Sequence, residues 1–317
     1  MRKKPIPKSD ILMDILQKTI SNAWNIRDHI HQPSIDRWLE NFTGEALCNI
    51  DDRSKRERAA KREKQLALFL LCNFVYYNEN EIKYLTKVML DKYIHNVFIS
   101  ESKNTITNID FNNLIQKTLF TFLGNISESS SYLLYLFRQE NDLSKECFVE
   151  NGTTENIVFI DDFSITGSQA SSYINKKISQ YPQEGNKKFY VLLMITTDEA
   201  IKELEKINNV TVLPCIVLDG NSKAFSDSSI VFAGYADIYK FMAKKMCEYY
   251  GKKITISKNG AIPLGFGNGG YMFGAYYNIP DNTLPIFWSS QNNWNYLFKR
   301  YDKKYNFDRM TLGGRYV

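Results

Sequence analysis

The feature that most constrains this chain is an apolar run at residues 157–160 that ends in two adjacent carboxylates, Asp161 and Asp162. Three of the four apolar residues are β-branched, which is typical of a strand buried on both faces of a sheet. Small residues follow at 166–168, and residues 169–178 have the composition of a helix. A strand, a turn and a helix in this order predict one unit of a parallel α/β sheet.

This unit combines two kinds of binding group. Open α/β sheets bind ligands at the carboxyl ends of their strands, where Asp161 and Asp162 are expected to lie. The turn at 166–168 would present free backbone N–H groups at a helix N-terminus, which favours an anion. Carboxylates accept hydrogen bonds from hydroxyls, and a sugar phosphate carries both groups. The alternative interpretation is an ordinary Asx-type turn before an N-capped helix, with no ligand.

At these residues the chain resembles the phosphoribosyltransferases that use phosphoribosyl pyrophosphate (PRPP). Their signature is a hydrophobic strand, two acids, two or three variable residues and then Thr/Ala-Gly-x-Thr. Asp161 and Asp162 match the acids. Thr166 and Gly167 match the core of the phosphate loop, and Ser168 is its free position.

Two positions set this chain apart within that resemblance. Gln169 departs from the usual Thr at the end of the loop, where orotate-type members also vary. Ile165 stands where purine-salvage members carry an Asp that acts as general base. This difference argues against a hypoxanthine-guanine-type enzyme, and no residue is identified as a base for the incoming nucleophile.

The resemblance implies a role for each part of the motif. Asp161 and Asp162 would be the catalytic acids, which hold the ribose 2′ and 3′ hydroxyls and stabilise positive charge at the anomeric carbon. Mg²⁺ would be the cofactor, bound through the diphosphate of PRPP and not directly by the protein. The 5′-phosphate would bind a loop that consists of Ile165, Thr166, Gly167, Ser168 and Gln169.

A hydroxyl-rich loop at 124–131 follows a predicted strand and enters a helix. Serine hydroxyls and free N–H groups suit phosphate oxygens, and the resemblance implies a pyrophosphate loop at this place. The alternative is a solvated turn followed by a surface arginine. The candidate pyrophosphate contacts are Ser127, Glu128, Ser129, Ser130 and, one helix later, Arg138.

Apolar patterning divides the chain into a helical part and an α/β part. Residues 1–105 are predicted to form a helical N-terminal domain, with one long helix at 53–77 and another at 79–98. Residues 106–220 are predicted to form the core, and residues 221–317 a C-terminal helix and an aromatic, glycine-rich hood. We expect the core to be a five-stranded, mostly parallel sheet of the phosphoribosyltransferase type, with helices on both faces. Its predicted strands lie at 118–123, 146–149, 157–160, 189–195 and 210–218.

Composition favours a folded protein of the cytoplasm. The net charge of +5 permits an anionic ligand but does not by itself indicate nucleic acid. The five cysteines show no metal-ligand spacing and are expected to be reduced thiols. The basic N-terminus is not followed by a signal sequence, and no apolar run is long enough to span a bilayer. We therefore expect a cytoplasmic location and no membrane contact.

The N-terminal region offers two candidate contact surfaces. A basic run at 53–64 is interspersed with acidic residues and lacks aromatic residues, so a solvated helix face is favoured over a nucleic-acid patch. Apolar stripes on more than one helix face, including Trp38 and Phe74, predict that residues 1–100 dock on the core, on a protein partner or on a second copy of the chain.

The C-terminal part carries a G-x-G-x-x-G at 265–270 without a strand before it, so a dinucleotide fingerprint is not expected. With the segment Asn-x-Pro-Asp-Asn-Thr-Leu-Pro-x-Phe-Trp at 278–288, it resembles the phosphoribosyltransferase-like proteins of bacterial anti-phage systems, some of them encoded beside retron reverse transcriptases. That resemblance implies a defence effector or regulator that acts on PRPP or a nucleotide. The alternatives are a non-catalytic PRPP- or nucleotide-sensing module that contacts DNA or a partner protein, and a toxin that breaks down a nucleotide or PRPP.

Overall fold

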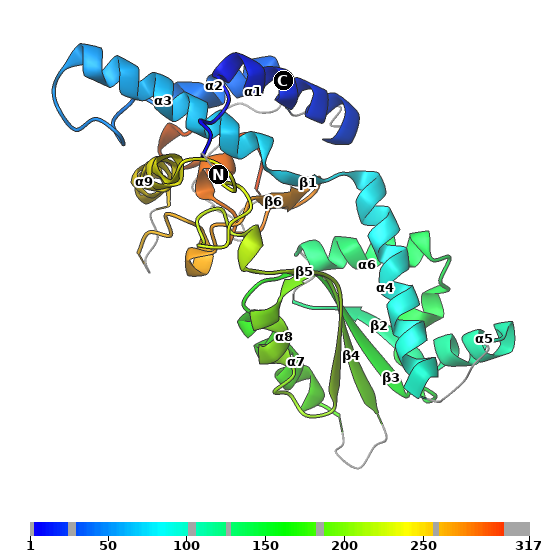
Figure 1. Ribbon diagram of the computed structural model, residues 1–317. Helices are drawn as coiled ribbons and strands as arrows, with labels where there is room; N and C mark the ends of the chain where they lie inside the picture. The colour runs from blue at the N-terminus through cyan, green and yellow to red at the C-terminus, as the bar shows by residue number, and fades with distance from the viewer. Residues whose placement is uncertain are drawn as a thin grey trace, which may run out of the picture.

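The computed structural model describes residues 3–24, 30–100, 106–124, 128–181, 187–255 and 260–300 (Figure 1). The strands in these ranges are β1 (Val75–Tyr77), β2 (Thr118–Phe122), β3 (Asn156–Ser164), β4 (Lys188–Thr197), β5 (Val210–Leu218) and β6 (Phe273–Ala275). The α-helices are α1 (Ser9–Thr19), α2 (Gln32–Glu40), α3 (Arg53–Cys72), α4 (Glu79–Ser100), α5 (Asn108–Gln116), α6 (Ser129–Glu140), α7 (Ser168–Ile178), α8 (Asp198–Leu204) and α9 (Asp237–Ile254). Shorter helical turns are η1 (Ile20–Trp24), η2 (Lys145–Phe148), η3 (Gly220–Ser222), η4 (Phe266–Asn268), η5 (Pro285–Phe287) and η6 (Gln291–Asn293).

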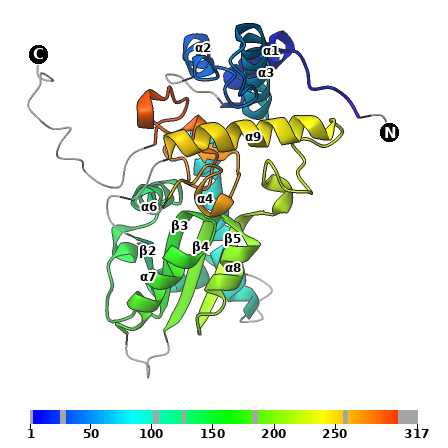
Figure 2. The ribbon, with the colours of Figure 1, turned by 90° about the vertical axis from the view of Figure 1, so that its left-hand side faces the viewer.

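Strands β2, β3, β4 and β5 pair in parallel, in that order, and form the four-stranded sheet of the described residues. Successive side chains of a strand point to opposite faces of the sheet. Val158 and Ile160 of β3 pack in a hydrophobic cluster with α4 and α6, whereas Ile157 and Phe159 pack in another with α7 and α8. Both faces of the sheet are therefore covered by helices, as predicted for an α/β fold (Figures 1 and 2).

The predicted strand at 146–149, the second of the five in chain order, is wrong, because this segment forms the 3-10 turn η2. The N–H of Cys147 donates to the carbonyl of Ser144 (3.2 Å), and the N–H of Val149 donates to the carbonyl of Glu146 (3.3 Å). These backbone groups are used inside the turn and do not extend a sheet. The segment also lacks the alternating burial of a strand, since Cys147 is its buried residue. The motif strand β3 is consequently the second of four strands in the sheet, beside β2.

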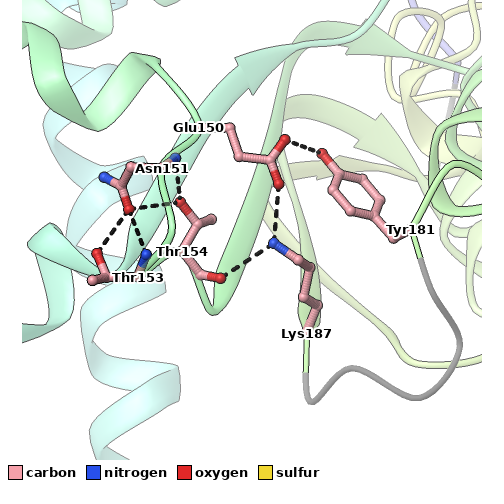
Figure 3. Close-up of polar contacts among 6 residues, drawn as sticks. All are labelled: Glu150, Asn151, Thr153, Thr154, Tyr181 and Lys187. Carbon is pink, nitrogen blue, oxygen red and sulfur yellow. Dashed lines mark hydrogen bonds and ion pairs between the residues drawn. The ribbon is translucent and has the colours of Figure 1, made fainter.

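At the amino ends of β3 and β4, a polar cluster holds together the turns that enter the two strands (Figure 3). Glu150 accepts hydrogen bonds from Lys187 Nζ (3.0 Å) and from the hydroxyl of Tyr181 (3.2 Å). Lys187 Nζ also donates to the carbonyl of Thr154 (3.2 Å), and the Asn151 N–H donates to the hydroxyl of Thr154 (3.1 Å). This cluster fixes the end of the sheet that lies opposite the two acids.

The predicted helix at 53–77 is too long by one turn. Helix α3 ends at Cys72, and the Asn73 side chain donates to the carbonyl of Phe69 (2.8 Å). The N–H of Val75 then donates to the carbonyl of Met272 (2.9 Å), and β1 pairs in parallel with β6. Val75, Tyr76 and Tyr77 are residue types that favour strands, and β6, which is distant in the sequence, gives their backbone a partner for hydrogen bonds.

A second hydrophobic core joins both ends of the chain. It contains buried residues of α1, α2, α3 and α9 together with the C-terminal segment 284–298. The ring of Trp38 stacks on Phe287 with centroids 5.7 Å apart, and its Nε1 donates to the carbonyl of Ile286 (2.7 Å). Figures 1 and 2 both show α9 beneath helices α1 to α3. Helices α1 to α3 thus pack on the C-terminal part of the chain and not on the predicted core at 106–220. Docking on a protein partner or on a second copy stays a prediction.

Helix α4, although it belongs to the first hundred residues, packs against α6, β4 and β5 and not with α1 to α3. The first hundred residues therefore contribute to two hydrophobic cores. The division of the chain into domains at residues 105 and 220 stays a prediction, and residues 101–105 at the first boundary lie outside the described residues.

The five cysteines all lie in the described part of the chain and are free thiols, as predicted. Within the same residues, none of the helices has the length and apolar character that a membrane span requires.

We predict that Gly251→Ala destabilises the protein, although alanine usually stabilises a helix interior relative to glycine. Gly251 lies in α9, and a Cβ atom there would stand 2.1 Å from the carbonyl oxygen of Pro263. Overpacking of this kind typically costs about 1–3 kcal/mol, so thermal unfolding should show a Tm several degrees lower. Gly152→Ala is the matched control, because no described atom lies within 4 Å of its added Cβ. An unchanged Tm for Gly251→Ala would contradict the close approach of α9 to residue 263.

Candidate substrate-binding site

A cavity of about 800 Å³ lies at the carboxyl ends of β2 and β3, beneath the C-terminal segment 277–282. Figures 1 and 2 show parts of the C-terminal region, in orange, above this end of the sheet. Of the residues singled out in the sequence, the cavity brings together the two acids, the whole 165–169 loop and residues 128–130. Ser127 lies outside the described residues. Residues that the sequence did not assign to the site also line the cavity, and they include Tyr132, Tyr173, Phe266, Tyr277, Asn278, Asp281 and Arg300.

Strand β3 runs through both acids and ends at Ser164, four residues later than the sequence indicated. The strand therefore carries Asp161 and Asp162 at the carboxyl edge of the sheet, where neighbouring side chains point to opposite faces. Asp162 is buried and Asp161 is partly buried. A rigid strand, not a loop, thus sets the direction of each carboxylate.

Asp162 is the centre of a hydrogen-bond network that joins three segments. Its Oδ1 accepts from the hydroxyl of Ser129 (3.0 Å) and from the N–H of Phe163 (3.0 Å). Its Oδ2 accepts from Nδ2 of Asn278 (3.2 Å), and the same Nδ2 donates to the hydroxyl oxygen of Ser129 (2.9 Å). The start of α6, the end of β3 and the C-terminal segment are therefore held together at one carboxylate.

The two acids influence each other's ionisation. Burial raises the pKa of Asp161 well above its ordinary value, and the charge of Asp162 raises it further. Burial also raises the pKa of Asp162, but the hydrogen bonds from Ser129 and Asn278 act in the opposite direction. Within the pair, Asp161 therefore holds a proton more readily than Asp162 does. A ligand that brings hydroxyl donors or a cation would favour the ionised form of both acids.

The loop after β3 is built around Gly167, which has a φ of +72° and forms the N-cap of α7. A Cβ atom at Gly167 would lie 2.9 Å from the carbonyl oxygen of Ala200, so α8 leaves no room for a side chain there. Thr166 is half-buried. Ser168 and Gln169 are exposed at the start of α7, and both line the cavity. The sequence thus forms the free helix N-terminus that the motif predicted.

Ile165 has a structural role in this loop. Its side chain is buried in the hydrophobic cluster under α4 and α6, and its carbonyl accepts a hydrogen bond from the Thr197 hydroxyl (2.6 Å). The hydroxyl of Thr196 donates to the carbonyl of Ser164 (2.7 Å). Thr197 is also the N-cap of α8. Both threonines also tie the base of the loop to the end of β4.

The residues proposed for the pyrophosphate loop have different surroundings. The Ser129 hydroxyl contacts Asp162, as described above. Ser130 is buried, and its hydroxyl donates to the carbonyl of Leu123. Glu128 lines the cavity at the N-cap of α6. Arg138 is not among the lining residues, and its Nε donates to the carbonyl of Leu143 (3.3 Å).

The positive charge at the cavity comes from Arg300, the one cationic residue among the described lining residues. Its guanidinium pairs with Asp281 (3.2 Å) and lies 4.8 Å from the centre of the Trp288 ring. The lining also contains four carboxylates, those of Glu128, Asp161, Asp162 and Asp281. An anionic ligand would therefore meet more negative than positive charge and needs a cation of its own.

Two acids on a buried strand, beside a glycine-centred helix N-terminus at the carboxyl edge of a parallel sheet, define a phosphoribosyltransferase-like protein. The comparison with protein families agrees, since the PRTase-CE family model matches residues 35–300. The chain therefore belongs to the PRTase-CE family. Among curated proteins the chain has no match. The resemblance to phosphoribosyltransferases that the motif indicated is confirmed at the level of the family.

The raised pKa of Asp161 predicts a pH-dependent gain of stability in Asp161→Asn. An acid whose pKa is higher in the folded than in the unfolded protein destabilises the fold once the pH exceeds its unfolded value of about 4. The variant should therefore have a higher Tm than the wild type at pH 7, and the difference should vanish near pH 4. The exposed residue Asp91 provides the control, since Asp91→Asn is expected to leave the Tm unchanged at both pH values. A lower Tm of Asp161→Asn at pH 7 would show that the carboxylate is stabilised as an anion.

Proposed function

We propose that this protein binds PRPP or a closely related ribose 5-phosphate compound and transfers its phosphoribosyl group. The observation that carries the proposal is the meeting of Asp161, Asp162 and the Gly167 loop in one cavity. Carboxylates suit the hydroxyls of a ribose, and a free helix N-terminus suits its phosphate. Membership in a phosphoribosyltransferase-like family supports the same ligand.

In this proposal each segment of the lining has one task. The backbone N–H groups at residues 166–169 bind the 5′-phosphate, whose binding energy orients the sugar. Asp161 and Asp162 hold the two ribose hydroxyls. As the leaving group departs from the anomeric carbon, positive charge develops there and the two carboxylates stabilise it electrostatically. Residues 128–130 and Arg300 lie where a diphosphate leaving group would be accommodated, within the same cavity.

The charge of the lining fits a ligand that arrives with a divalent cation. The described residues contain no group of three or more His, Cys, Asp or Glu side chains that could hold a metal ion by itself. Four carboxylates line the cavity beside one guanidinium, so a bare diphosphate would be repelled. Mg²⁺ bound to the diphosphate supplies the positive charge that offsets this repulsion. The protein's part is to hold the sugar and the 5′-phosphate in place.

A non-catalytic sensor is the second candidate function, and the position of Ile165 favours it. In the purine-salvage branch that position supplies a general base, but here the side chain is buried in the hydrophobic core. A protein that binds PRPP or a nucleotide without turnover needs no base. Such a module would pass on the bound state through contacts with DNA or with a protein partner, including a second copy of the chain.

The biological setting that we propose is bacterial anti-phage defence in the cytoplasm. Support comes from the aromatic, glycine-rich C-terminal segment, whose sequence resembles that of the retron-associated members. The neighbouring genes provide the test: a reverse transcriptase or a winged-helix gene beside this one is expected. A conserved neighbourhood of nucleotide-salvage genes would argue against a defence role.

Calorimetric titration with PRPP and Mg²⁺ tests the ligand. The wild type should bind, and Gly167→Ala should lose at least about tenfold in affinity, since the added Cβ displaces the phosphate loop from α8. Gly234→Ala is the matched control, because Gly234 also has a positive φ of +81° but has open space around it. Both variants should lose stability by about 1 kcal/mol from backbone strain, but only Gly167→Ala should lose the ligand. No heat from the wild type at millimolar PRPP would sink the proposal.

A double substitution separates the enzyme from the sensor. Asp161→Asn combined with Asp162→Asn should abolish product formation but retain binding of the phosphate, because the removed charge acts mainly on the transition state. The adjacent pair Asp51 and Asp52 does not line the cavity and gives a matched control double variant. Asparagine also caps helices well, so this control keeps the cap that Asp52 provides to α3. Full biological activity of the Asp161, Asp162 variant would favour the sensor.

A further inference from the structure

The hydroxyl of Tyr277 differs from the other polar groups at the cavity. Tyr277 lines the cavity beside Asn278, and its hydroxyl oxygen is buried without a hydrogen-bond partner among the described residues. Nearly all buried side-chain polar atoms in proteins have a partner, so an exception calls for an explanation. In the described part of the chain, the Tyr277 hydroxyl is the one buried side-chain oxygen or nitrogen without a hydrogen-bond partner.

The tyrosine ring is held in place by its neighbours. Its centroid lies 5.1 Å from that of Tyr132 and 5.1 Å from that of Tyr276. The hydroxyls of Tyr132 and Tyr276 bond to each other (2.7 Å). The backbone of the following residue is also fixed, because the N–H of Ala275 donates to the carbonyl of Asn278 (2.8 Å). The free hydroxyl is thus fixed in position, and its two aromatic neighbours already satisfy each other.

The surroundings of this hydroxyl make it a hydrogen-bond donor. Burial raises the pKa of Tyr277 well above its ordinary value, and the charges of Asp162 and Asp161 add to the effect. The hydroxyl therefore keeps its proton at neutral pH. Both oxygens of Asp162 already accept hydrogen bonds from Ser129, Phe163 and Asn278. The hydroxyl of Tyr277 lies close to Asp162 but makes no hydrogen bond of normal geometry with it.

We propose that the Tyr277 hydroxyl donates a hydrogen bond to a ribose hydroxyl oxygen of the bound ligand, while that ribose hydroxyl donates its own hydrogen to Asp162. A sugar hydroxyl can donate one hydrogen bond and accept two, so it satisfies the carboxylate and the tyrosine together. This assignment rests on the proposed function and adds a residue of the C-terminal segment to the site. Tyr277 would make the cavity select a hydroxylated sugar and not any phosphate.

Calorimetry with two probes, ribose 5-phosphate and inorganic phosphate, tests this contact on the full chain. Tyr277→Phe should weaken binding of ribose 5-phosphate about fivefold to tenfold, the usual effect of one lost hydrogen bond. Binding of inorganic phosphate, which uses the Gly167 loop, should not change. The Tm of the variant should equal or exceed that of the wild type, because an unpaired buried hydroxyl has been removed.

Tyr276→Phe is the matched control. It removes a hydroxyl that is bonded to Tyr132, so it should lower the Tm slightly and leave ribose 5-phosphate binding unchanged. The inference is overturned if Tyr277→Phe binds ribose 5-phosphate as the wild type does, if it weakens both probes equally, or if Tyr276→Phe causes the same loss. If the wild type binds neither ribose 5-phosphate nor PRPP, the proposed function and this inference are both overturned. If the wild type binds and Tyr277→Phe binds equally well, the inference alone is overturned.

Discussion

The burial of two adjacent carboxylates at the end of β3 is the constraint on which the rest of this structure depends. An ionised carboxylate away from water is costly unless donors or cations surround it. Ser129 and Asn278, which lie 149 positions apart in the sequence, supply such donors to Asp162. Because the pKa of Asp161 stays well above its ordinary value, the protein alone satisfies only part of this requirement. A site that is incomplete in this way is suited to a ligand that brings hydroxyls and a cation.

The C-terminal segment can supply Asn278 only because distant parts of the chain hold it in place. Strand β6 precedes Asn278 and pairs with β1, which follows the N-terminal helices. Further along, Trp38 of α2 donates to the carbonyl of Ile286 and stacks on Phe287. The N-terminal helices therefore support the segment that covers the acids. The geometry of the site therefore depends on packing between the N-terminal helices and the C-terminal segment.

The sequence predicted those parts of the site that are local in the chain. Asp161, Asp162 and the Gly167 loop follow one another within nine residues, so strand propensity, turn chemistry and helix pattern reveal them together. Asn278 and Arg300 were not predicted because their positions at the cavity depend on tertiary packing. The bond from Asn278 to Asp162, for example, spans 116 positions of the sequence. Arg138 was a candidate cation beside the alternative of a surface arginine, and its Nε donor is used at the end of its own helix.

The fold was predictable to a similar extent, and for the same reason. Strands β2, β4 and β5 lie where apolar, β-branched runs indicated them. The misassigned strand at 146–149 is a short apolar run, and periodicity cannot distinguish such a run from a turn. Strand β1 was absorbed into a predicted helix because its partner β6 comes from the far end of the chain. The packing of α4 on the sheet likewise depends on contacts that no local pattern contains.

The two acids differ in how much of their hydrogen-bond capacity the protein itself uses. A carboxylate offers roughly four acceptor positions. Asp162 uses three of them for Ser129, Phe163 and Asn278. Asp161 accepts a hydrogen bond from the N–H of Asp162 (3.0 Å). Asp162 is thus the anchored acid, with room for about one further donor. Asp161 retains more free capacity and the more strongly raised pKa, so it has the greater need of a ligand's hydroxyl or cation.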